Sequence, residues 1–226
     1  MKSNDVPNDS PADAPEGVAA TGRRRRNRLI LLALLAVSVA PVVASYLLFY
    51  VFPPDGRTNY GQLVQPQRDL TSVPVTAEEI AAPEPEQTAI TLAPGAQATF
   101  SAFTGRWLMV VPSLGCDTDC RERLVAVRQV RLTTGRERSR VDRVWLRLDQ
   151  NAPPADVLAE HPGLHVLHID TGTLTEHFPA AGGHSPTEHI YMVDPLGHLM
   201  MRWPVQADPN RMKKDVMRLL KASRIG

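Results

Sequence analysis

The two cysteines of the chain, Cys116 and Cys120, are the residues whose type and spacing most clearly indicate chemistry. They follow an apolar run at residues 107–111 and precede a stretch whose apolar residues recur at near-helical spacing. Two sulfurs at a strand-to-helix turn can form a disulfide, transfer electrons to a partner, or hold a soft metal ion. A bridge that closes so short a loop restricts the unfolded chain less than a longer one does, so the spacing favours redox or metal chemistry over a purely structural disulfide.

The N-terminal part of the chain indicates the compartment in which these cysteines lie. Residues 29–52 form an apolar run without a charged residue, longer than the roughly 20 residues that a membrane-spanning helix needs. It also exceeds the apolar part of a cleaved signal peptide, which holds about 7–15 residues. Five arginines precede the run, and basic residues stay on the cytoplasmic side. We therefore expect a single-pass anchor in the inner (plasma) membrane, with the N-terminus cytoplasmic and the C-terminal domain periplasmic.

Composition divides the rest of the chain into three parts. Residues 1–28 are rich in small and polar residues and are expected to form a disordered cytoplasmic tail. Residues 53–88 contain recurring prolines, which predict an extended linker. Residues 89–226 have the length of one domain with its own core. The formal net charge is +1, and membrane topology accounts for the arginine run, so we expect no nucleic-acid partner.

Strands and helices alternate along the last of these parts. We expect strands at residues 107–112, 143–148, 163–169, 189–194 and 199–203, and helices at residues 119–133, 153–160 and 208–222, with Asp119 as the N-cap of the first helix. Cys116 lies between the first of these strands and the first helix, Cys120 lies at the start of that helix, and a hairpin and a closing helix end the chain. This order predicts an α/β, thioredoxin-like fold preceded by a single transmembrane helix.

Together, the anchor, the C-x3-C motif after the first core strand and the VDPLG hairpin at residues 193–197 resemble the Sco/SenC family. The segments at residues 52–63 and 194–223 are similar to a Sco-like group in proteobacteria. Family members are membrane-anchored, thioredoxin-like copper proteins that help to assemble cytochrome c oxidase. The usual motif is Cys-Pro-x-x-Cys-Pro, whereas Asp117 and Arg121 follow the two cysteines here. The resemblance implies a partner that is a cytochrome c oxidase subunit or another copper chaperone.

The resemblance also indicates which residues would hold copper. Cys116 and Cys120 match the cysteine pair of the family. The histidine ligand is matched by His184, in the sequence Gly-His-Ser at residues 183–185, and His189 is the other candidate. Two thiolates and either imidazole would give a three-coordinate site suited to copper.

Three functions therefore remain open at this point. The first is copper binding and delivery, or thiol redox chemistry, during assembly of cytochrome c oxidase. The second is metal-free thiol–disulfide exchange, and the third is a non-catalytic scaffold with a structural disulfide. The charges beside the cysteines favour metal handling, because Asp117 and Asp119 disfavour a free thiolate that a soft metal ion would stabilise, and Arg121 and Arg123 offset only part of this effect.

Overall fold

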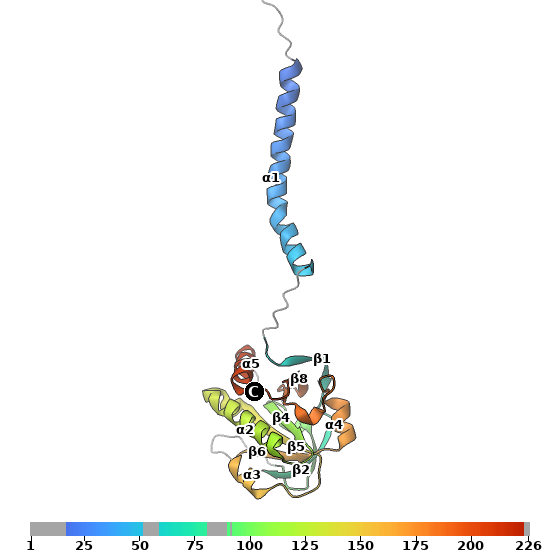
Figure 1. The fold of residues 1–226 in the computed structure, drawn as a ribbon, viewed down its shortest axis with the longest axis vertical. Helices are drawn as coiled ribbons and strands as arrows, with labels where there is room; N and C mark the ends of the chain where they lie inside the picture. Colours follow the sequence, from blue (N-terminus) through green and yellow to red (C-terminus); the bar gives the residue numbers. More distant parts are fainter. Residues whose placement is uncertain (1–16, 52–58, 81–89, 91, 224–226) are drawn as a thin grey trace, which may run out of the picture. The chain divides into compact units, whose positions relative to one another are not determined.

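The computed structural model describes residues 17–51, 59–80, 90 and 92–223 (Figure 1). The chain forms two compact units, Met1–Arg57 and Thr58–Gly226, and each is described by itself.

The first unit contains one long helix, α1, at Gly17–Val51. Its segment Arg25–Leu48 has a mean hydropathy of 2.4 and exposed side chains, so it is long and apolar enough to cross a membrane. The prediction of a disordered tail over residues 1–28 is wrong for residues 17–28, which are helical, and residues 1–16 lie outside the described part. Alanine and arginine favour helix, and extending an existing helix avoids the cost of nucleation.

The second unit is built on one eight-stranded sheet with the strand order β1-β8-β7-β4-β5-β6-β2-β3. Strands β4, β5 and β6 run parallel, and β7 and β8 form the expected hairpin. The strands are β1 Gln62–Asp69, β2 Pro74–Ile80, β3 Gln97–Thr99, β4 Trp107–Ser113, β5 Val141–Arg147, β6 Leu164–His168, β7 Tyr191–Val193 and β8 His198–Arg202. The helices are α2 Thr118–Thr133, α3 Ala155–Glu160, α4 Thr171–His177 and α5 Pro209–Ala222, with short 3-10 turns η1 Phe100–Phe103, η2 Gly135–Arg140 and η3 Pro186–Glu188.

The sheet separates two apolar cores. Residues of α2, α3 and α5 pack on one face, where Val127 and Met212 are fully buried. Residues of η1 and α4 pack on the other face, where Phe100 and Phe178 are buried. Helices on both faces of a mixed sheet with a parallel centre (β4, β5 and β6) confirm the predicted α/β, thioredoxin-like architecture (Figure 1).

The domain begins earlier in the chain than the sequence predicts. The prediction of a proline-rich linker over residues 53–88, followed by a domain from residue 89, is wrong for β1 and β2, which belong to the sheet. The prolines are compatible with these strands because Pro66 lies in edge strand β1 and Pro74 is the first residue of β2. The remainder of that predicted linker, residues 53–58 and 81–88, lies outside the described part.

A buried carboxylate fixes the start of this domain. Asp215 of α5 is 2 % exposed and accepts hydrogen bonds from the backbone amides of Tyr60 at 3.0 Å and Gly61 at 2.8 Å. It also accepts one from the indole Nε1 of Trp203 at 3.1 Å. The guanidinium of Arg211 lies 3.9 Å from the centre of the Tyr60 ring. These contacts hold the segment before β1 against β8 and α5, and we call them the Asp215 clasp.

Candidate redox site

The cysteine pair forms a disulfide at the turn between β4 and α2. The Cα atoms of Cys116 and Cys120 are 5.1 Å apart, within the range of ordinary disulfides. Strand β4 ends at Ser113 and α2 begins at Thr118, so the backbone reverses direction across the pair. Cys120 is completely buried in the core, whereas Cys116 is partly exposed. Cys116 is therefore the sulfur that a partner can reach.

The first turn of α2 is stabilised by Asp117. Its carboxylate accepts a hydrogen bond from the backbone amide of Cys120 at 2.9 Å, which makes Asp117 the N-cap. The prediction that Asp119 caps this helix is therefore wrong. Asp117 has the extended backbone that an N-cap needs, and Asp119 already lies inside the first turn. Asp117 follows Cys116 directly in the chain and accepts a hydrogen bond from the Cys120 amide, so this cap connects the two ends of the C-x3-C motif.

His189 is a structural residue in the disulfide form. Its side chain is buried, and its Nδ1 lies 2.9 Å from the carbonyl oxygen of Trp203, so Nδ1 carries the proton and donates it. Nε2 then accepts a hydrogen bond from the backbone amide of Ala181 at 3.1 Å. Burial lowers the pKa of His189, which favours this neutral form. Both ring nitrogens are engaged, so neither has a lone pair free for a metal.

His184 is arranged differently. Its side chain is 44 % exposed, and its Nδ1 lies 2.9 Å from Oε2 of Glu188. The other oxygen of Glu188 accepts a hydrogen bond from the backbone amide of Ser185 at 2.7 Å. The Ser185 amide, and then His184, lower the pKa of the Glu188 carboxyl. A carboxylate that orients one nitrogen of an imidazole leaves Nε2 as the nitrogen available to a ligand.

The predicted copper ligands do not form a metal site in this disulfide form. Within the part of the chain that the structure describes, no three His, Cys, Asp or Glu side chains lie close enough to hold a metal ion. The disulfide also engages both sulfur atoms. A site made from Cys116, Cys120 and His184 would require reduced thiols, so this ligand set stays a prediction.

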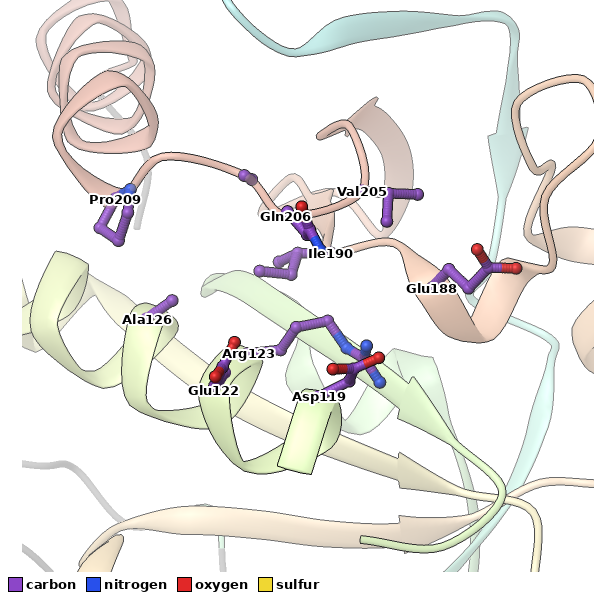
Figure 2. Close-up of a pocket in the computed structure, with 10 residues that line it drawn as sticks. Asp119, Glu122, Arg123, Ala126, Glu188, Ile190, Val205, Gln206 and Pro209 are labelled. Atoms are coloured by element: carbon purple, nitrogen blue, oxygen red, sulfur yellow. The ribbon is translucent and has the colours of Figure 1, made fainter. Parts of the chain in front are cut away.

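A pocket of about 280 Å³ lies beside the disulfide-bearing turn (Figure 2). It opens between α2, η3 and the segment after β8, so the part of the chain that contains Glu188 and Ile190 faces the cysteine helix. Figure 2 shows that Arg123 and Asp119 of α2 line one side of the pocket, with Glu188 of η3 on the other side. Burial lowers the pKa of Arg123, and the charges of the nearby carboxylates oppose this shift.

Two parts of this region were not predicted from the sequence. Gln206, on the pocket wall, has a backbone φ of 55°, a left-handed conformation that glutamine rarely adopts and that no local pattern indicates. Asp215 could have been found, because it falls between Met212 and Val216 on the apolar face of α5. An acidic residue on a buried helix face needs hydrogen-bond donors, which indicates a structural or functional contact.

Comparison with known proteins gives a family and a set of similar folds. A protein-family model described as "Transmembrane-like, thioredoxin-like, C-terminal domain" matches residues 107–223. No match is found among curated protein sequences.

Three solved structures illustrate the similar folds. Copper-bound ScoI of Bradyrhizobium japonicum is 17 % identical, with 55 % of this chain and 91 % of that chain covered and a TM-score of 0.42. Apo Sco1 from Thermus thermophilus is 16 % identical, with coverages of 73 % and 96 % and a TM-score of 0.45. The thioredoxin domain of a thiol-disulfide oxidoreductase from Bacteroides vulgatus is 10 % identical, with coverages of 68 % and 97 % and a TM-score of 0.44. Similarities at this level describe the type of fold and carry no argument about function.

Proposed function

Because the chain belongs to the family of transmembrane-like, thioredoxin-like C-terminal domains, we propose that Cys116 and Cys120 are a thiol–disulfide exchange site that acts on a partner protein. In this proposal α1 anchors the protein in the inner membrane, with its N-terminus cytoplasmic and the redox domain periplasmic. The apolar length of α1 and the arginines at its start support that orientation.

The exchange follows from the two sulfur positions. In the reduced protein, the Cys116 thiolate attacks a disulfide of the partner, forming a mixed disulfide and releasing one partner sulfur as a thiolate. The Cys120 thiolate then attacks the sulfur of Cys116, which forms the Cys116–Cys120 disulfide and releases the second partner thiolate. Two electrons pass from the protein to the partner, and a dithiol reductant must restore the reduced pair. The reverse sequence oxidises a partner dithiol.

The difference in exposure between the two sulfurs carries this proposal. A purely structural disulfide needs no accessible sulfur, whereas exchange needs one accessible sulfur and one that resolves the mixed disulfide from inside. Cys116 is partly exposed at the end of the β4–α2 turn, and Cys120 is buried at the third helical position of α2. The carboxylate of Asp117 stabilises the first turn of α2, which contains Cys120, through its hydrogen bond with the Cys120 amide.

Single cysteine variants of the full-length protein in detergent test the proposal. Reduced Cys120→Ser should attack a small disulfide such as 2-hydroxyethyl disulfide through Cys116 and accumulate as a stable mixed disulfide, visible by mass spectrometry. Reduced Cys116→Ser should react much more slowly, because its remaining thiol is buried. Equal rates for the two variants would overturn the assignment. Restoration of full cellular function by a Cys116→Ser/Cys120→Ser double variant would instead support a non-catalytic scaffold.

A second candidate function, copper handling, is favoured by the arrangement of His184. Glu188 orients Nδ1 of that imidazole and leaves Nε2 available, as in many histidines that bind metals. In the reduced protein, Cys116, Cys120 and His184 would supply two soft sulfurs and one nitrogen, a donor set that suits copper as cargo. The resemblance to Sco proteins extends this candidate to a partner that is a cytochrome c oxidase subunit or another copper chaperone.

Copper titration of the reduced protein separates the two candidates. Copper handling predicts stoichiometric Cu(I) binding that weakens in His184→Ala and is lost in Cys116→Ser. His189→Gln is the matched control, because both ring nitrogens of His189 already form hydrogen bonds within the fold. This variant should change stability more than copper affinity. Binding that is insensitive to both Cys116→Ser and His184→Ala would exclude this site.

A further inference from the structure

The pocket beside the disulfide has the size to receive one side chain of a partner. Its volume of about 280 Å³ is smaller than most small-molecule sites, which hold about 300–1,000 Å³. Asp119 forms part of its wall and directly precedes Cys120 in the chain (Figure 2). A side chain bound there would therefore lie next to the exchange site.

The wall of this pocket combines an apolar part with an acidic part. The apolar residues include Ala126, Ile190 and Pro209. The charged residues are three carboxylates and one guanidinium, so the formal charge of the pocket is negative: Asp119, Glu122, Glu188 and Arg123. An apolar surface beside excess negative charge matches a side chain with a methylene stem and a cationic end.

Arg123 offsets only one of the three formal negative charges of the pocket. Its Nε atom is buried and has no hydrogen-bond partner within the described ranges. Asp117, and then Asp119 and Glu188, attract its charge, but among the described contacts Arg123 forms no ion pair within 4 Å. Glu122 is exposed on the pocket wall and, in the same part of the chain, has no ion-pair partner. At least one carboxylate is therefore available to a ligand.

The arrangement of the carboxylates favours an organic cation over a metal ion. No three acidic, histidine or cysteine side chains of the described chain are close enough to surround a metal. A lysine or arginine side chain does not need three ligands around one point. It can pack its methylene stem on the apolar wall and direct its charged end toward separate carboxylates.

We propose that this pocket selects partners that carry a lysine or arginine side chain next to the cysteine that exchanges with Cys116. This inference rests on the proposed thiol–disulfide exchange and adds a substrate preference to it. Opposite charges raise the rate at which two surfaces meet, and salt screens the effect. The preference should therefore be strongest at low ionic strength.

Peptide exchange rates test the preference on the full-length reduced protein in detergent. Three peptides carry one cysteine as a mixed disulfide and differ only in a neighbouring residue, which is Lys, Gln or Glu. At low salt we expect the Lys peptide to react about tenfold faster than the Glu peptide, and we expect this ratio to shrink toward one in about 0.5 M NaCl. Glu122→Lys should reduce or reverse the order of the peptides.

A variant outside the pocket provides the matched control. Glu160→Gln, at the end of α3, changes the net charge as Glu122→Gln does, but Glu160 does not line the pocket. The preference should fall in Glu122→Gln and persist in Glu160→Gln. Equal rates for the three peptides, or an equal fall in both variants, would overturn the pocket assignment while leaving thiol exchange intact. Failure of the wild-type protein to react with 2-hydroxyethyl disulfide would overturn both proposals.

Discussion

Reduction of the Cys116–Cys120 disulfide is expected to destabilise the folded domain by about 2 kcal/mol. The two cysteines are four positions apart, so the bridge closes a loop of about five residues. In the chain-entropy description, closing a loop of this length removes about 7 cal/mol/K from the unfolded state, which corresponds to about 2 kcal/mol at 25 °C. Asp117 caps α2 through the Cys120 amide, an interaction that does not require the disulfide, so we assign no further loss to the helix.

The same difference lowers the reduction potential of the cysteine pair in the folded protein. If the disulfide stabilises the native state by about 2 kcal/mol, the native pair has a reduction potential roughly 40 mV below that of the same two cysteines in the unfolded chain. A lower potential makes the dithiol the better reductant. The prediction is therefore that the native dithiol is a better reductant than the same two cysteines in the unfolded chain, and the direction of exchange with a given partner then depends on the potential of that partner.

Urea unfolding with and without a phosphine reductant measures this difference, with tryptophan fluorescence as the signal. The Cys116→Ser/Cys120→Ser double variant is the control, and its unfolding should be unaffected by the reductant. A reduced protein that is as stable as the oxidised protein, or more stable, would refute the reasoning. That result would mean that the folded state stabilises the thiolates and would favour an oxidant.

Three further predictions concern single residues around the site and the core. Asp215→Ala should lower the free energy of unfolding by about 3 kcal/mol in urea denaturation, because three donors lose a buried carboxylate; a loss below about 1 kcal/mol would contradict the clasp. Asp117→Ala should cost about 1 kcal/mol in the same assay, through loss of the N-cap of α2. Burial, together with neighbouring arginines, lowers the pKa of His161 from 6.5 to about 4. Its neutral form is favoured in the folded state, so stability should be full above pH 6.5 and fall by up to about 3 kcal/mol as the pH drops toward 4; His161→Leu should remove this loss from the stability–pH profile.

The central part of the fold could be predicted because its signals are local. The continuous apolar run that became β4 is buried on both faces, and the periodic apolar residues of α2 and α5 bury one face of each helix. Both patterns are visible within a short window of sequence. The long apolar run before residue 53 indicated α1 in the same way. The position of the cysteine pair at the β4–α2 turn followed directly from these elements.

The remaining parts depend on contacts between distant residues. Strands β1 and β2 contain prolines that suggest a linker, and only their pairing with β8 and β6 shows that those positions tolerate proline. The role of His189 depends on Ala181 and on the carbonyl of Trp203, fourteen positions away, so its residue type alone could not separate a ligand from a core residue. No sequence pattern indicated that Glu122 and Glu188 would line one pocket.

The Asp215 clasp limits how far from a membrane the redox domain can act. Residues 52–58 alone connect the end of α1 at Val51 to the fixed segment that begins at residue 59, so the chain from Val51 to Tyr60 spans at most about 30 Å even when fully extended. A linker that continued to residue 88 would have allowed a reach of more than about 100 Å. If α1 is the membrane anchor, a partner would therefore meet Cys116 no farther from the bilayer than this linker plus the width of the domain allows.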